Sequence, residues 1–306
     1  MDYLNNFNRL KEYPKISIVT PSYNQVDFLE ETIHSVLSQN YPNLEYIIID
    51  GGSTDGSVDI IKKYENHLHF WCSEPDEGHY AAINKGFSHS TGEIMAWLNS
   101  DDIYFGGALK TVASIMSDLK EVEWLTTLSP AAYDYKGFCL GFASIAGYDK
   151  EAFFDGYYSP WSGKYIGWIQ QESTFWRRSL WDKAEGGIRT QFEYAGDFDL
   201  WSRFFLHADL YGTHTPLGGF RYRFNQRVRQ EDFYKNEAEA ILNNILKTYK
   251  PSEHYLRDKL IQFKISKIPK LKTFLTDNYG FSGKKIIRKN PENLNSSWEV
   301  EPYKFL

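Results

Sequence analysis

Cysteine is scarce in this chain of 306 residues, which has only Cys72 and Cys139. The two lie far apart and do not form the paired spacing of a zinc site, so the sequence argues against a disulfide framework and a structural zinc. A reducing cytosol is therefore the expected compartment.

The chain also lacks a long apolar run. No segment approaches the roughly 18 apolar residues that cross a bilayer, and residues 1–15 lack the charged-then-apolar order of a signal peptide. We therefore expect no membrane-spanning segment and no leader.

Positive charge is not in excess either, because the formal net charge is −6, so a general attraction to nucleic acid is not expected.

What the chain does have is a globular composition, 42% hydrophobic and 24% charged, with a regular alternation of patterns in its N-terminal third. Apolar strand patterns alternate with helix patterns at 27–40, 58–65 and 79–90, and the strand patterns lie at 15–24, 44–57, 67–78 and 93–102. The first strand is expected to break at Pro21. This order predicts an α/β fold with a mostly parallel central sheet flanked by helices.

Polar residues gather where the predicted strands end, at Thr20–Asn24, Asp50–Asp55, Asp76–Gly78 and Asn99–Asp102. In parallel sheets ligands lie beyond the carboxyl ends of the strands, so these segments are expected to line one cleft. The adjacent carboxylates of Asp101 and Asp102 repel each other unless a cation lies near them, and hard oxygen ligands suit Mg²⁺ or Mn²⁺.

The alternation weakens after residue 108. Residues 147–168 are aromatic and rich in glycine, which indicates loops with short strands, whereas 170–187 suits a strand followed by a helix. A further helix is predicted over 194–208, with Asp197 and Asp199 near its start. From 236 to 306 the chain becomes basic, and we expect a mainly helical extension there.

Three segments taken together resemble the successive motifs of glycosyltransferase family 2: residues 16–57, 74–102 and 196–201, the last reading "GDFDLW". The resemblance covers roughly residues 14–225. Members of that family are inverting enzymes of the GT-A fold, which is Rossmann-like. The resemblance implies a GT-A domain over 1–235 that moves a sugar from a nucleotide-diphosphate donor to a hydroxyl of a saccharide or lipid-linked acceptor. UDP, dTDP and GDP sugars are the candidate donors, and surface polysaccharide or glycoconjugate biosynthesis is the expected setting.

The resemblance also implies roles for individual residues. Asp197 is the expected catalytic base, with Asp199 in reserve, and Asp101 and Asp102 are the expected ligands of Mg²⁺ or Mn²⁺. Asn99 stands where a carboxylate is usual, so the metal is expected to be weakly held. The residues expected to bind the donor are Thr20, Pro21, Tyr23, Asn24, Asp50, Gly51, Ser53, Asp55, Asp76, Gly78, Asn84, Lys85, Asn99, Ser100 and Arg223.

Arg223 stands where related enzymes often have a histidine. A guanidinium stays protonated and binds phosphate rather than metal, so Arg223 is expected to help neutralise the diphosphate, with Arg221 or Arg227. The aromatic segment 157–168 offers Trp161 and Trp168 as acceptor-binding rings, although aromatic packing under a loop explains them equally well.

Two alternative functions and one question about the C-terminal part stay open. One is a nucleotidyltransferase that makes nucleotide sugars, although the Gly-rich, basic phosphate loop of such enzymes is missing after the first strand. Another is an inactive sugar-binding module, which would not need Asp197. In the C-terminal part, Lys259, Lys264, Lys267, Lys270 and Lys272 interleave with apolar residues, so this segment either contacts the inner face of the membrane or packs against the catalytic domain.

Overall fold

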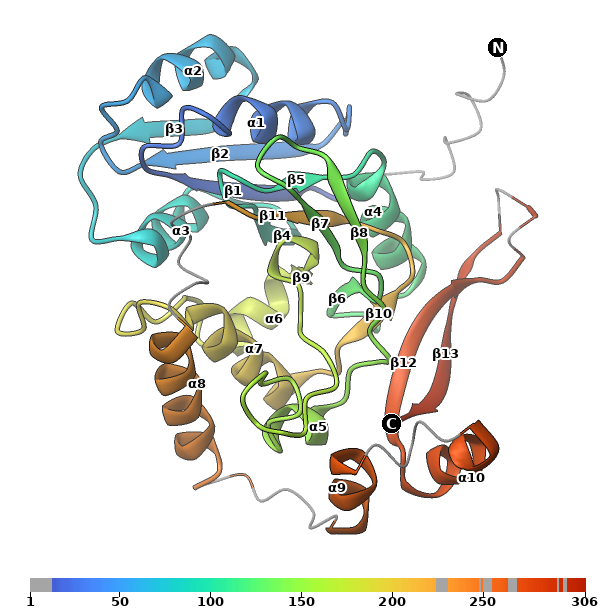
Figure 1. The fold of residues 1–306 in the computed structure, drawn as a ribbon. Helices are drawn as coiled ribbons and strands as arrows, with labels where there is room; N and C mark the ends of the chain where they lie inside the picture. Colours follow the sequence, from blue (N-terminus) through green and yellow to red (C-terminus); the bar gives the residue numbers. More distant parts are fainter. Residues whose placement is uncertain are drawn as a thin grey trace.

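The structure, a computed structural model, describes residues 13–223, 231–247, 249, 255–263, 269–290, 292–293 and 296–306 (Figure 1). Its main sheet has the strand order β13-β12-β10-β6-β9-β4-β1-β2-β3. These strands are β1 Ile16–Ser22, β2 Leu44–Asp50, β3 Phe70–Ser73, β4 Ile94–Trp97, β6 Trp124–Thr127, β9 Phe175–Arg177, β10 Tyr211–Thr213, β12 Phe281–Arg288 and β13 Trp298–Phe305.

Helices follow the strands as the alternation predicted. They are α1 Leu29–Leu37, α2 Ser57–Tyr64, α3 His79–Ser88, α4 Ala108–Asp118, α5 Lys150–Phe154, α6 Arg178–Lys183, α7 Gly196–His207, α8 Glu231–Ile245, α9 Tyr255–Gln262 and α10 Pro269–Tyr279. Helix α3 packs on β1 and β2, and α6 packs on β9. The fold class, an α/β fold around a mostly parallel sheet, is confirmed.

The sequence predicted that the first strand breaks at Pro21, and this prediction is wrong. β1 continues to Ser22, and its register with β2 ends at the pair Ser22 and Asp50. On its other edge β1 pairs with β4 only as far as Val19. At Pro21 that edge has no strand partner, so the missing N–H of proline costs no ladder hydrogen bond.

Two features of the sheets were not predicted. β9 runs antiparallel to both of its neighbours, β4 and β6. A second sheet has the order β5-β11-β7-β8, with β5 Ile103–Tyr104, β11 Gly218–Arg221, β7 Ala131–Tyr133 and β8 Cys139–Phe142. Because β5 pairs with β11, this sheet brings the chain after Asp102 beside the chain before Arg223.

The aromatic segment 147–168 contains the helix α5 and, among its residues, no strand, which corrects the expected short strands. Asp149 caps α5 by accepting a hydrogen bond from the Ala152 amide, so the chain there is helical before it becomes a loop.

The C-terminal part contains helices, as expected, and also the hairpin β12–β13, which was not predicted (Figure 1). β12 pairs in parallel with β10, so the hairpin extends the main sheet, and α8 spans the expected domain boundary at 235. The division of the chain at that residue stays a prediction. Lys264, Lys267 and Arg227 lie outside the described residues, as do the side chains of Lys270 and Lys272. Within the described ranges no helix is both long enough and apolar enough to span a bilayer.

Candidate active site

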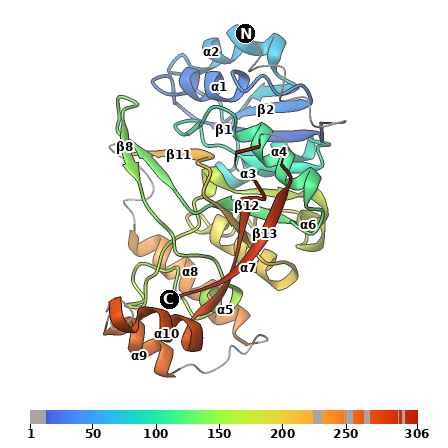
Figure 2. The ribbon, with the colours of Figure 1, turned by 90° about the vertical axis from the view of Figure 1, so that its right-hand side faces the viewer.

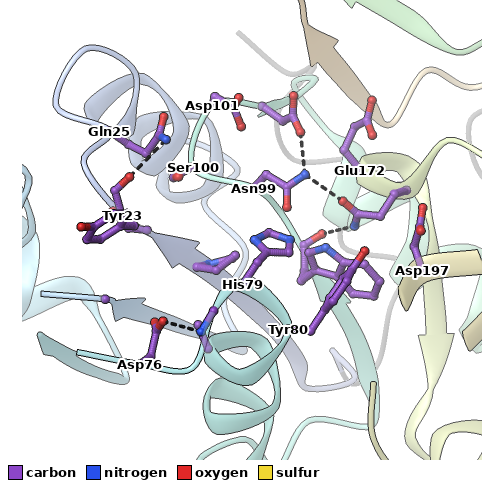
Figure 3. A pocket seen from close by; sticks show the side chains of 18 of the residues that line it. Tyr23, Gln25, Asp76, His79, Tyr80, Asn99, Ser100, Asp101, Glu172 and Asp197 are labelled. Carbon is purple, nitrogen blue, oxygen red and sulfur yellow. Dashed lines mark hydrogen bonds between the residues drawn. The ribbon is translucent and has the colours of Figure 1, made fainter. Parts of the chain in front are cut away.

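A cavity of about 790 Å³ opens where the parallel strands end (Figure 3). Tyr23 and Asp76 lie at one end of it, and Glu172 and Asp197 lie at the other, with Asn99 between them. Of the residues singled out from the sequence, eleven line it: Pro21, Tyr23, Gly51, Asp76, Gly78, Asn99, Ser100, Asp101, Asp102, Asp197 and Arg223. Residues from four strand ends and from α7 therefore meet in one cleft, as the polar segments indicated.

The two adjacent carboxylates are held differently. Asp101 Oδ2 lies 2.5 Å from Arg223 Nε, an ion pair between two residues that line the cavity. Asp102 is almost fully buried and accepts hydrogen bonds from the Arg221 amide at 2.9 Å and from Asn99 Nδ2 at 3.1 Å. Asn99, which stands in place of the usual carboxylate, thus orients Asp102.

Acidic groups are concentrated in this cavity. Burial raises the pKa of Asp102 well above its ordinary value, and the nearby charges of Asp101 and Glu172 raise it further. Burial likewise raises the pKa of Glu172. The fold therefore gathers carboxyl groups where they disfavour each other's ionised forms, an arrangement that a bound cation would relieve.

The residues present fit a divalent cation that takes some of its ligands from the protein and the rest from the bound substrate. Asp101 and Asp102 offer hard oxygen ligands, and the buried Oδ1 of Asn99 accepts no hydrogen bond. In the part of the chain that the structure describes, no group of three or more His, Cys, Asp or Glu side chains is placed to hold a metal. Mg²⁺ and Mn²⁺ sites of this kind take one or two carboxylates from the protein and further oxygens from substrate phosphates.

Asp197 lies in the first turn of α7 and faces the cavity (Figure 3). Burial raises its pKa to about 6, although hydrogen bonding with the helix-start amides and with the Tyr234 hydroxyl lowers it. Its Oδ1 is buried without a hydrogen-bond partner. A carboxylate with an available oxygen and a pKa near 6 is suited to accept a proton.

Asp199, the reserve candidate, has a structural role instead. Its carboxylate binds Arg203 at 2.9 Å and Arg189 at 3.2 Å, and it does not line the cavity. These contacts tie α7 to the chain after α6, since Arg203 also donates to the carbonyls of Ala184 and Gly187.

Several expected donor-binding residues do not line the cavity. Asp50 is buried and accepts from the amides of Gly52 and Ser53 and from the Ser53 and Ser73 hydroxyls. Thr20, Asn24 and Asp55 are similarly engaged: Thr20 contacts the Tyr46 hydroxyl, Asn24 accepts from the Thr54 amide, and Asp55 accepts from the Val26 amide. These residues join the loops after β1 and β2, so they shape the cavity without lining it.

Asn84 and Lys85 are also outside the cavity. Asn84 exchanges two hydrogen bonds with the backbone of Ile188, and Lys85 forms an ion pair with Glu74. Trp161 and Trp168 do not line the cavity either. Trp161 packs against Tyr234, with ring centroids 6.0 Å apart, and Trp168 is partly exposed.

Sequence reasoning missed several residues that line the cavity, among them His79, Tyr80, Gln171, Glu172 and Tyr234. Glu172 had no clear signal, because it stands in the polar run Gln170–Thr174 ahead of the strand β9. Tyr234 had none, since its place depends on α8 folding back onto α7.

Comparisons with known proteins show which family and which fold the chain resembles. The profile of the family described as Glycosyl transferase family 2 matches residues 17–128. The segment 17–128 is therefore similar to a glycosyltransferase family 2 domain. That match contains Asp101 and Asp102 and ends before Glu172, Asp197 and Tyr234, so the far half of the cavity lies beyond it.

Relatives support the family 2 domain. TuaG of Bacillus subtilis, named as a teichuronic acid biosynthesis glycosyltransferase, is 36% identical over 130 residues, which cover 42% of this chain. The chain spans only 48% of the length of TuaG.

Staphylococcus aureus TarS 1–349 in complex with UDP-GlcNAc has a TM-score of 0.57 at 17% identity, covering 86% of this chain and 74% of that one. A mannosyltransferase of Pyrobaculum calidifontis, PcManGT, in complex with GDP-Man and Mn²⁺ has a TM-score of 0.50 at 16% identity, covering 90% of this chain and 89% of that one. These neighbours establish the GT-A fold for the chain.

Proposed function

We propose that the protein is an inverting glycosyltransferase that uses a nucleotide-diphosphate sugar. The observation that carries the proposal is the order of groups along one cavity, in which Asp101 and Asp197 lie apart (Figure 3). Asp102 and Arg223 also line the cavity, and Arg223 forms an ion pair with Asp101. A nucleotide sugar needs groups that stabilise its departing diphosphate and, on the far side of the anomeric carbon, a base for the acceptor.

The reaction is a single displacement. Asp197 accepts the proton of the acceptor hydroxyl while the acceptor oxygen bonds to the anomeric carbon. The bond between that carbon and the phosphate oxygen breaks, and the electron pair leaves with the nucleoside diphosphate. Attack from the face opposite the leaving group inverts the anomeric configuration.

The charge on the departing diphosphate is stabilised by Arg223, which lines the cavity beside Asp101. Asp101 and Asp102 would hold a Mg²⁺ or Mn²⁺ ion, which supplies positive charge to the diphosphate oxygens. The Mn²⁺ in the complex of the mannosyltransferase supports this assignment.

The nucleoside end of the donor fits beside Tyr23, Gly51 and Asp76. Tyr23 is 62% exposed and lines the cavity, so its ring is available to a base. A Cβ added at Gly51 would lie 2.9 Å from Asp76 Oδ2, so glycine keeps this end of the cavity open. UDP, dTDP and GDP sugars are the candidate donors, and the UDP-GlcNAc complex of TarS supports a UDP sugar.

The acceptor is a saccharide or lipid-linked hydroxyl in surface polysaccharide biosynthesis, which the name of TuaG supports. Trp161 and Trp168 remain candidates for its outer part, and contact of the C-terminal segment with a membrane surface remains a further proposal. The presence of Asp197 in the cavity favours an enzyme over an inactive sugar-binding module.

A thermal-shift panel tests the proposal. UDP-, dTDP- and GDP-sugars are each added with and without Mn²⁺, because a ligand that binds only the folded state raises the midpoint. We expect the sugars of one nucleotide class to raise the unfolding midpoint, and to raise it more when Mn²⁺ is present. No shift with any nucleotide sugar would contradict the proposal.

A further inference from the structure

Helix α8 lies outside the segment matched by the family, and it packs along α7 (Figures 1 and 2). Ala238 and Ile241 of α8 are buried. Tyr234 and Glu237 are three residues apart, so they project from the same side of the helix. Both reach the start of α7.

Glu237 binds the backbone just ahead of α7. Its Oε1 accepts from the Glu193 amide at 2.9 Å, and its Oε2 accepts from the amides of Tyr194 at 2.8 Å and Ala195 at 2.7 Å. The N-cap residue of α7 is Ala195, which has no side-chain acceptor. A carboxylate from another helix therefore binds consecutive N–H groups at the point where a helix start needs acceptors.

Tyr234 lines the same cavity as Asp197. Its hydroxyl favours the charged form of the Asp197 carboxyl and so lowers the pKa of that group. Its ring packs edge-on against Trp161 and Phe198, with centroid distances of 6.0 and 6.4 Å. This packing restricts the ring, so the hydroxyl has a defined direction.

We propose that Tyr234 and Glu237 are positioning residues for Asp197. Glu237 fixes the backbone from which α7 begins, and Tyr234 orients the Asp197 carboxylate toward the cavity. The segment beyond the family match thus completes the catalytic end of the cleft. This inference rests on the proposed function only in giving Asp197 the role of base.

The two residues have opposite effects on the proton affinity of Asp197. Hydrogen bonding by Tyr234 lowers the pKa of Asp197, and the negative charge of Glu237 raises it. Other titratable groups around Asp197 come from separate elements: Tyr80 of α3, whose ring lies against Gly196, Glu172 before β9, and Tyr194 in the chain ahead of α7. Those groups are unchanged when α8 is altered, so substitutions on α8 isolate its contribution.

The test is a ¹³C NMR titration of the full chain labelled at aspartate Cγ, with the Asp197 signal assigned by its loss in Asp197→Asn. We expect Tyr234→Phe to raise the apparent pKa of Asp197 and Glu237→Gln to lower it, each by about half a unit or more. Matched controls are Tyr249→Phe, remote from the cavity, and Glu239→Gln, which removes the same charge from an exposed position of α8. Both controls should titrate as the wild type does.

A second variant separates charge from position. Glu237→Asp keeps the charge but shortens the side chain, so amide hydrogen exchange at residues 193–195 should become at least several-fold faster. Glu239→Asp is the control, and exchange at these residues should not change in it. Wild-type titration in both Tyr234→Phe and Glu237→Gln, or unchanged exchange in Glu237→Asp, would overturn the inference. None of these readouts requires turnover. If Asp197→Asn retained normal transfer, the proposed function would fail while the positioning of Asp197 could still be measured.

Discussion

Arg223 and Asp101 form an ion pair at one side of the cavity, with Nε 2.5 Å from Oδ2. Both residues line the cavity, and the pair joins the end of β11 to the acidic segment after β4. A divalent cation that binds Asp101 must compete with this guanidinium. The same guanidinium is placed to bind a diphosphate, so Arg223 affects metal binding and donor binding in opposite directions.

We expect Arg223→Ala to bind Mn²⁺ more tightly in the absence of donor, by roughly tenfold, because Asp101 loses its competing partner. The variant should also show little transfer at low Mn²⁺, where the wild type keeps measurable activity, because the diphosphate has lost a cation. Calorimetry with Mn²⁺ and activity against Mn²⁺ concentration measure the two effects. Arg223→Lys, which keeps the charge, is the matched control, and identical metal curves for wild type and Arg223→Ala would rule this account out.

Gly51→Ala should weaken nucleotide binding. The added Cβ would lie 2.9 Å from Asp76 Oδ2 and 3.3 Å from Tyr23 Cδ2, so these side chains must move into the space for the nucleoside. We expect a loss of about tenfold in affinity for the nucleoside diphosphate, or about 1.4 kcal/mol, measured by calorimetry. Gly106→Ala is the control, because a Cβ there meets no atom within 4 Å. Equal affinities in the two variants would show that Gly51 does not border the donor.

The buried Asp197 should make the protein less stable at high pH. Its pKa of about 6 is above its ordinary value of 3.8, so the folded state binds the proton more tightly than the unfolded state does. The resulting stabilisation is fully present below pH 3.8 and is lost as the pH rises through about 6. Asp197→Asn, which removes the ionisable group, should therefore gain stability relative to wild type between pH 4 and pH 8, by as much as ~3 kcal/mol.

Urea denaturation of both proteins at the two pH values measures this gain. Asp59→Asn serves as the control, because Asp59 is exposed and forms only a surface pair with Lys62. If the difference in stability between wild type and Asp197→Asn did not change with pH, burial would not disfavour the charged form of Asp197, and the prediction would be wrong.

The sequence predicted the side of the cavity that belongs to consecutive strands. Asp101, Asp102 and Asp76 follow strands with clear apolar patterns, and the ends of parallel strands meet at one edge of a sheet whatever the details of packing. The same reasoning could not tell lining residues from supporting ones. Asp50 follows a strand in the same way, but its oxygens bind the turn that comes after it.

The rest of the cavity depends on long-range packing. Arg223 reaches Asp101 through the pairing of β5 with β11, and Tyr234 reaches Asp197 through the packing of α8 on α7. Neither contact leaves a local pattern in the sequence. Asp197 could be found because its motif resembled a known one, whereas Tyr234 and Glu237 had no motif to mark them.

Sugar transfer by Asp197→Asn, measured beside donor binding and the configuration of the wild-type product, tests the central claim most directly. The nucleotide sugar identified in the thermal-shift panel is used with a saccharide acceptor. Because Asn cannot accept the acceptor's proton, we expect transfer to fall by about 10²–10⁴ while donor affinity changes little. NMR of the wild-type product should show an anomer inverted relative to the donor. Near-normal transfer by the variant, or a product of retained configuration, would contradict the account.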